Sequence, residues 1–205
     1  MKEWLEPELE NYVKEQVLPR YEESDPAHGL AHVCQVMENS RELARPLDVE
    51  WRMVYVVAAY HDIGIPVKGR ANHEKTSAQI LREDTVLSRW FTQDEVETMA
   101  QAVEDHRAST GREPRSLYGR IVSEADRDID PERIVRRCME YGKAKFPQMD
   151  EEWQIRRTVD YVRERYGEGG YIRLWLPSPQ NKRGIEVLRE WLKTGELEEV
   201  CRKYG

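Results

Sequence analysis

The chain has 205 residues, of which 35% are charged and 39% hydrophobic, and its formal net charge is −7. This length suits one domain with a sizeable core, and no apolar run approaches the roughly 20 residues that span a bilayer. The negative charge argues against binding to extended nucleic acid, and the acidic start "MKEWLEPELE" lacks the apolar core of an export signal. We therefore expect a cytoplasmic protein without a membrane partner.

Helical periodicity dominates the sequence, and the alternation typical of strands is scarce. The predicted helices cover about residues 3–18, 24–45, 49–62, 73–82, 93–106, 116–126, 131–142, 150–166 and 183–199. The second begins at Ser24-Asp25-Pro26, which offers a capping residue and an early proline. The third ends at Gly64 and Pro66, and a loop follows. We expect an all-α helical bundle that forms a single domain over residues 1–205.

The three cysteines are odd in number and widely spaced, at Cys34, Cys138 and Cys201. They predict neither a disulfide framework nor a CxxC metal site. Free thiols in a reducing cytoplasm are the expectation. A nucleophilic role is the weaker interpretation, and only Cys34, two residues after His32, is a candidate for it.

An apolar helix near the middle of the first half ends in two polar residues, His61 and Asp62, within "VVAAYHDIGIP". The helix dipole opposes a carboxylate at a C-terminus, and burying either group without a partner is costly. A divalent ion would satisfy both: imidazole and carboxylate suit Mn, Fe, Co, Ni or Zn, and carboxylates also admit Mg. Further ligands must come from elsewhere, and the candidates are His32, His73, His106 and Asp126.

Each of these candidates has another explanation when it is considered alone. His32 shares a face with apolar residues and suits a buried structural histidine, and it also shares a face with His28, four residues earlier. His73 suits a surface position at a helix start. His106 suits a partner for a helix C-terminus, and Asp126 suits a cap for the following segment.

Their order along the chain resembles the HD-domain superfamily of metal-dependent phosphohydrolases. The stretch "HGLAHVCQV" is similar to the helix of that family's first histidine, "AYHDIG" to its central signature, and "EADR" to its closing aspartate motif. The resemblance covers about residues 24–130 and implies the helical HD bundle. Residues 131–205 match no motif, and we expect extra C-terminal helices there.

The resemblance also implies a set of metal ligands. The ligands of the first metal correspond to His32, His61, Asp62 and Asp126. In members with two metals, Asp62 would bridge the ions and two further histidines would hold the second ion. His73 in "NHEKTSAQIL" and His106 in "AVEDH" occupy the corresponding stretches. We therefore expect one or two divalent ions per chain, with a dinuclear site favoured.

The implied activity is hydrolysis of a phosphate ester or anhydride, in a nucleotide-like small molecule, by metal-activated water. Besides Asp62, His28 is a candidate to bind or protonate the leaving group. Arg127 adjoins Asp126 and is the first candidate to bind phosphate, which Arg does bidentately. Many family members carry Lys soon after the HD pair, whereas Lys68 comes later here. The basic residues near the proposed ligands are Lys68, Arg70, Lys75, Arg107, Arg120 and Arg127.

Two other functions stay open. Some relatives are mixed-valent di-iron oxygenases, which need the same dinuclear pattern, and the ligand types do not separate Fe from Mn or Mg. Iron together with O₂ uptake would favour that class. A regulatory module that binds a nucleotide or metal without turnover is the non-enzymatic alternative. A homodimer is also left open, because aromatic residues of the C-terminal segment suit a dimer face as well as a core.

Overall fold

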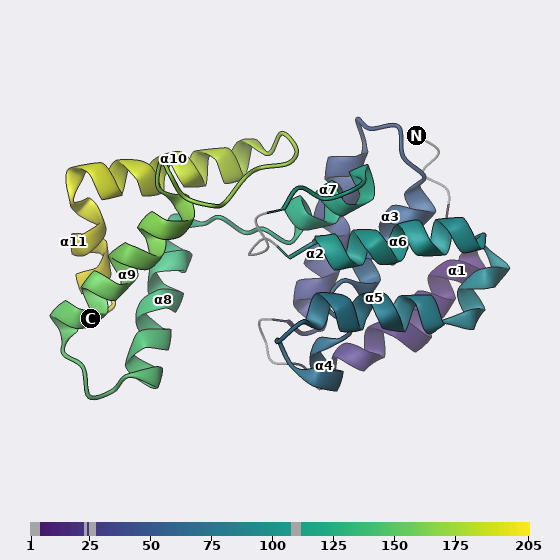
Figure 1. Ribbon diagram of the computed structural model, residues 1–205, viewed down its shortest axis with the longest axis horizontal. Helices are drawn as coiled ribbons and strands as arrows, with labels where there is room; N and C mark the ends of the chain where they lie inside the picture. The colour runs from purple at the N-terminus through teal and green to yellow at the C-terminus, as the bar shows by residue number, and fades with distance from the viewer. Residues whose placement is uncertain (1–4, 23, 25–27, 108–111) are drawn as a thin grey trace. The chain divides into compact units, whose positions relative to one another are not determined.

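The computed structural model describes residues 5–22, 24, 28–107 and 112–205. Within these ranges the chain forms helices and turns and no β-strand, so the predicted all-α class is confirmed. The chain divides into two compact units, Met1–Asp126 and Arg127–Gly205 (Figure 1). That the two make a single domain stays a prediction. None of the described helices combines the length and the apolar character needed to cross a bilayer.

The first unit contains seven labelled α-helices and three short helical turns among its described residues. In chain order these are α1 (Pro7–Tyr12), η1 (Val13–Val17), η2 (Leu18–Tyr21), α2 (Leu30–Ala44), α3 (Trp51–Tyr60), α4 (Ile65–Lys68), α5 (His73–Glu83), η3 (Thr85–Arg89), α6 (Gln93–Asp105) and α7 (Leu117–Ala125).

Helix α3 forms the centre of the first unit. All of its residues except Arg52 are buried, as expected for a helix that is apolar on every side. It packs against α2, α6 and α7, and α5 packs against α6. Ala58 and Ala59 are fully buried, and their small side chains allow the neighbouring helices to approach closely near the C-terminal end of α3. This end of α3 leads directly into the HD pair.

The helices that follow have well-defined starts. Thr92 and Glu95 form a reciprocal capping box at the start of α6, and the hydroxyl of Ser116 accepts a hydrogen bond from Gly119 N at the start of α7. The predicted helices over 73–82, 93–106 and 116–126 are confirmed to within one residue at each end. Each of these helices has one apolar and one polar face, and this pattern is visible in the sequence.

The predicted helix over residues 3–18 is wrong in its second half. Regular α-helix ends at Tyr12, and the winding changes to the π-helical turn η1 and then to the 3-10 turn η2. Pro19, within η2, has no amide proton and cannot continue an α-helical ladder. Residues 3 and 4 of the prediction lie outside the described residues.

The second helix begins later than expected. Helix α2 starts at Leu30, after Gly29 in an extended conformation, so His28 precedes the helix and does not lie on its face. Of the predicted start, Asp25 and Pro26 lie outside the described residues.

The stretch expected to be a loop after the HD pair contains the short helix α4. Pro66 stands in its first turn, where the missing amide proton costs nothing and the fixed φ favours helix. Pro66 therefore stands at the start of a helix. The sequence pattern predicted only that it ends the preceding helix. Lys68 is the last residue of α4.

The second unit consists of α8 (Pro131–Lys145), α9 (Glu151–Tyr166), α10 (Pro179–Thr194) and α11 (Glu196–Arg202). Its core includes Met139, Ile155, Val162 and Leu188, which are almost fully buried. The single helix predicted over 183–199 is wrong, because Gly195, with φ of 83°, divides it into α10 and α11.

The cysteines of the described residues are free, as expected. Cys138 and Cys201 are buried in the second unit, and Cys34 is exposed on α2. No disulfide therefore contributes to either core.

Candidate metal centre

The HD pair lies in a tight turn directly after α3. The helix ends at Tyr60, one residue before His61, so the pair follows the helix and is not its last turn. Ile63 N donates to Tyr60 O at 3.3 Å, and Ile65 N donates to Asp62 O at 2.9 Å. His61 is 0% and Asp62 2% exposed, so both polar groups must find partners inside the protein.

The ends of five helices bring these partners together. His32 lies in the first turn of α2, and His73 is the first residue of α5. His106 directly follows α6, and Asp126 directly follows α7. The C-terminal ends of α3, α6 and α7 therefore lie beside the same small volume. Helix C-termini carry partial negative charge, so this arrangement favours a cation.

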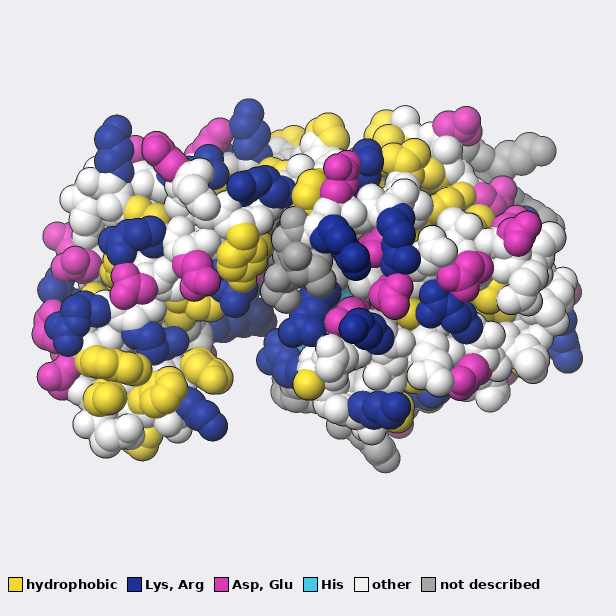
Figure 2. Space-filling view, in the orientation of Figure 1, with side chains coloured by type: hydrophobic (Ala, Val, Ile, Leu, Met, Phe, Trp, Pro, Cys, Tyr) yellow, Lys and Arg dark blue, Asp and Glu magenta, His cyan; other side chains and the backbone are white. Residues whose placement is uncertain are grey.

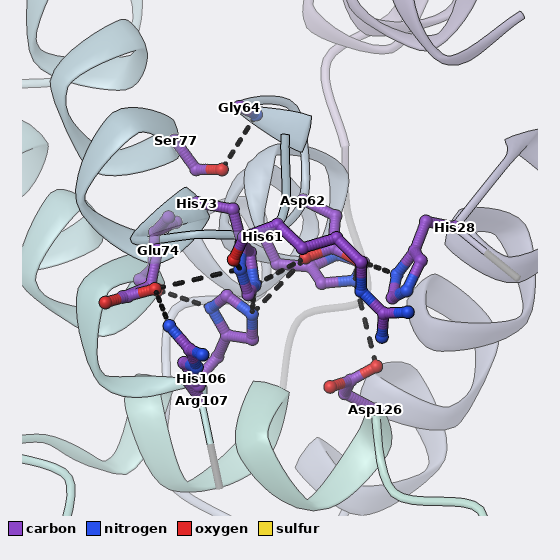
Figure 3. A network of polar contacts seen from close by, with 12 residues as sticks. His28, His61, Asp62, Gly64, His73, Glu74, Ser77, His106, Arg107 and Asp126 are labelled. Carbon is purple, nitrogen blue, oxygen red and sulfur yellow. Dashed lines mark hydrogen bonds and ion pairs between the residues drawn. The ribbon is translucent and has the colours of Figure 1, made fainter. Parts of the chain in front are cut away.

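All five histidines of the chain and two aspartates belong to this site (Figure 3). They form three groups in which one ligand atom from each residue lies within 4.8 Å of the others. The groups are His28, His32 and Asp62; His32, His61 and Asp126; and Asp62, His73 and His106. We call His32, His61 and Asp126 the first cluster, and Asp62, His73 and His106 the second cluster.

In the first cluster the Nε2 atoms of two histidines face one carboxylate oxygen. His32 Nε2 lies 3.1 Å from Asp126 Oδ1, and His61 Nε2 lies 3.9 Å from the same oxygen. The two Nε2 atoms are 3.3 Å apart. Asp62 Oδ2 adjoins this group, at 3.7 Å from His32 Nε2 and 3.5 Å from His61 Nε2.

In the second cluster the other oxygen of Asp62 plays the corresponding part. Asp62 Oδ1 lies 3.1 Å from His73 Nε2 and 3.4 Å from His106 Nε2. These two nitrogens are 3.1 Å apart. One carboxylate therefore presents Oδ2 to the first cluster and Oδ1 to the second.

Backbone carbonyls orient three of the rings. Nδ1 of His61 lies 2.8 Å from Ala58 O, and Nδ1 of His106 lies 2.6 Å from Val103 O. Nδ1 of His73 lies 3.0 Å from the carbonyl of Arg70. A carbonyl accepts only, so we assign the proton to Nδ1, which leaves the Nε2 lone pairs directed into the site. The Nε2 atoms of His73 and His106 lie 3.1 Å apart, and their lone pairs repel each other unless a cation or a proton lies between them.

Electrostatics within the site keep the carboxylates ionised. Burial would raise the pKa of Asp62, but His61 and the contacts with His106, His28 and His73 outweigh burial and hold that pKa below its usual value. Burial lowers the pKa of His61, which favours the neutral imidazole that binds metals. Burial also opposes charge on His106, yet Asp62 raises the pKa of His106 to about 9. A proton there takes the place that a cation would take.

The residues present fit a divalent metal. Imidazole nitrogens and carboxylate oxygens are a donor set for first-row transition metals. Among the described residues, Asp62 Oδ1 is buried and meets no side chain in hydrogen-bonding geometry, although two imidazole nitrogens face it. A buried carboxylate oxygen in this state is a strong acceptor that an ion would satisfy.

The remaining predicted catalytic residues lie in different places. His28 joins the site from the segment before α2, with Nδ1 at 2.8 Å from Asp62 Oδ2 and its ring edge-on to that of His32. Lys68 is exposed at the end of α4. Arg127 is the first residue of the second unit, where its guanidinium donates to the carbonyl of Arg173.

The other basic residues named from the sequence include two with acidic partners. Arg107 Nη1 donates to Glu74 Oε2 at 3.0 Å, and Arg120 Nη2 donates to Glu113 Oε1 at 2.7 Å. On the face shown in Figure 2, a small histidine surface is visible beside Lys and Arg side chains. His61 and His106 are almost fully buried, whereas His28, His32, His73 and Asp126 are partly exposed.

Sequence reasoning missed the buried carboxylate of Glu74. This residue is 5% exposed, and its Oε2 lies 3.7 Å from His73 Nδ1. Its place directly after His73 was the one available signal. A glutamate in the first turn of a charged helix normally suits the surface, so the pattern alone favoured exposure.

Comparisons with known proteins relate the chain to a known family and fold. Residues 29–128 match the family model of the HD domain. The chain is also similar to a crystal structure described as a predicted HD superfamily hydrolase from an uncultured Thermotogales bacterium. The identity is 20%, the alignment covers 97% of this chain and 92% of that chain, and the TM-score is 0.51. This second likeness shows a shared fold. No curated protein matches the sequence significantly.

The helical fold and the His/Asp site define a helical protein with a potential metal-binding centre. The chain contains an HD domain over residues 29–128. HD domains bind divalent metals, and the three His/Asp groups of this chain are able to hold such ions.

Proposed function

We propose that this protein is a phosphohydrolase with two divalent ions, which hydrolyses a phosphate ester or anhydride of a nucleotide-like small molecule. One observation carries the proposal: the two oxygens of Asp62 face two different histidine clusters. Asp62 would bridge the ions. The first ion would take His32, His61 and Asp126, and the second would take His73 and His106.

The bound ions would supply a water of lowered pKa as nucleophile and would neutralise charge on the phosphoryl oxygens. The protein's own residues do the rest. The carbonyls of Ala58, Val103 and Arg70 hold three imidazole rings by Nδ1, so that Nε2 is directed at the site and would bind an ion. Burial of His61 and Asp62 excludes bulk water from the floor of the site.

His28 is the proposed acid for the leaving group. Its Nδ1 contacts Asp62 Oδ2 at 2.8 Å, and its Nε2 is buried with no hydrogen-bond partner among the described residues. A proton on Nε2 would pass to the leaving-group oxygen as the P–O bond breaks, and His28 would become neutral. The carboxylate of Asp62 stabilises the charged imidazole before the transfer.

Two basic residues are the proposed phosphate ligands. Lys68 is exposed at the end of α4, a few residues after the HD turn. Arg127 adjoins Asp126 in the sequence and belongs to the second unit, so its part in phosphate binding rests on sequence alone.

The test begins with elemental analysis of the purified protein. Metal-stripped protein is then reloaded with Mn²⁺, Fe²⁺, Mg²⁺, Co²⁺, Ni²⁺ or Zn²⁺ and assayed for phosphate release from phosphomonoesters, a phosphodiester and nucleotides. We expect metal-dependent release and none from Asp62→Ala. Full activity of stripped protein or of Asp62→Ala would reject the mechanism. Bound iron with O₂ uptake and no phosphate release would favour the oxygenase. Tight nucleotide binding without turnover for any metal would favour a regulatory module.

A further inference from the structure

The turn that carries Asp62 is hydrogen-bonded to the helix that carries His73. Gly64 N donates to Ser77 Oγ at 2.9 Å, and Ser77 is fully buried on α5 (Figure 3). A Cβ atom on Gly64 would lie 2.8 Å from both His73 O and Ser77 N, so the backbones are in direct contact. This contact lies two residues beyond Asp62 and at the first turn of α5. It therefore joins the segment that carries Asp62 to the helix that carries His73.

A second hydrogen bond has the same relationship to the first cluster. Asn39 Nδ2, on α2, donates to Ala125 O at 3.0 Å, directly before Asp126. Gln35 Nε2 donates to Asn39 Oδ1 at 3.0 Å, which fixes the orientation of the amide. Helix α2 also carries His32, so this contact joins the segments that carry His32 and Asp126.

We propose that Ser77 and Asn39 are positioning residues, each for one ion of the pair: Ser77 for the ion of the second cluster and Asn39 for the ion of the first. This inference rests on the dinuclear site of the proposed function. Each hydrogen bond joins two segments that carry ligands of the same cluster. Groups that hydrogen-bond a metal ligand directly typically change metal affinity about 10–100-fold, and Ser77 and Asn39 act one step further out, through the segments that carry the ligands.

The experiment is a calorimetric titration of Mn²⁺ into metal-stripped full-length protein, with elemental analysis to fix the stoichiometry. Ser77→Ala is expected to weaken binding of the ion at the second cluster about tenfold. Asn39→Ala is expected to weaken binding of the ion at the first cluster by a similar factor. Ser77→Cys, which keeps the volume and a weaker acceptor, is expected to act in the same direction to a smaller extent. The two substitutions are then repeated in His106→Ala, where the ion of the first cluster remains. There, Asn39→Ala should weaken that ion, and Ser77→Ala should not.

Ser40→Ala is the matched control. Ser40 is fully buried on α2, and among the described residues its hydroxyl has no hydrogen-bond partner. The substitution removes the same atom without touching a ligand-bearing contact, and both ions should bind as in the wild type. Thermal unfolding of every variant confirms that each is folded.

Three outcomes would overturn the inference. Ser77→Ala weakens the binding of both ions equally, it weakens the binding of the one ion that remains in His106→Ala, or it has the same Mn²⁺ affinities as Ser40→Ala. If the wild type binds two ions and releases phosphate, these outcomes contradict the inference and leave the proposed function intact. A wild type that binds one ion contradicts the dinuclear site and, with it, this inference.

Discussion

Asp62 Oδ1 lies 3.1 Å from His73 Nε2, and this contact joins the turn after α3 to the first residue of α5. The other oxygen of the same carboxylate lies 3.5 Å from His61 Nε2. One side chain thus contacts both histidine clusters, whereas every other predicted ligand belongs mainly to one side. Selective substitutions can therefore separate the two sides of the site.

Asp62→Asn should abolish binding of both ions, because the amide offers neutral donors and one acceptor where the carboxylate offered two charged oxygens. Phosphate release should fall at least about 100-fold. Elemental analysis after reloading with Mn²⁺ checks the first statement. Asp94→Asn, at an exposed position in the first turn of α6, is the control and should bind metal normally. Two ions retained by Asp62→Asn would contradict the bridging role.

His106→Ala should lower the stoichiometry from two ions to one. Its Nε2 lies 3.1 Å from His73 Nε2 and 3.4 Å from Asp62 Oδ1, so its loss removes a donor from the second cluster alone. The affinity of the remaining ion, measured by titration, should stay close to that of the wild type. A stoichiometry of one for both wild type and variant would show a mononuclear site.

His28→Gln should reduce kcat most for substrates whose leaving group must be protonated as it departs. General acid catalysis contributes about 10²–10⁴-fold, so the loss should be large for an alkyl phosphate and small for p-nitrophenyl phosphate. The metal content should not change. His28 also belongs to one of the three potential metal-binding groups. Loss of an ion together with equal losses for both substrates would show that His28 is a ligand and not an acid.

Stability should fall as the pH rises from 10 to 12. Tyr12 donates to Asp84 Oδ2 at 2.5 Å, and Tyr60 donates to the same oxygen. Burial and the nearby Asp84 raise the pKa of Tyr12 to about 12, and the same causes raise the pKa of Tyr60. In this window the native state keeps protons that the unfolded chain loses, so the free energy of unfolding decreases with pH.

Urea denaturation at several pH values between 9 and 12 measures this decrease. Tyr12→Phe removes one of the retained protons, and its free energy of unfolding should change less steeply with pH. Tyr141→Phe, at a position 58% exposed in the second unit, should keep the wild-type slope. An unchanged slope for Tyr12→Phe would show that the Tyr12–Asp84 hydrogen bond does not contribute in this way.

Much of the helical architecture of the first unit could be read from the sequence. The apolar segment before His61 has no polar face, which predicts a central helix, and α3 is buried on all sides. The amphipathic patterns of α5 and α6 placed their ends within one residue. The winding after Tyr12 and the break at Gly195 were missed, although Pro19 and Gly195 are themselves local signals against a continuous α-helix.

The sequence by itself determined the helical class, the HD family and the seven ionisable residues that meet in the site, because residue type and order carry that information. Only the tertiary structure decided which atoms face one another. That His28 reaches Asp62 from outside α2, and that each oxygen of Asp62 faces a different cluster, depends on how separate segments of the chain pack together. The contacts of Ser77 with Gly64 and of Asn39 with Ala125 arise in the same way. No local pattern encodes such contacts, because each joins segments whose approach is set by the core between them.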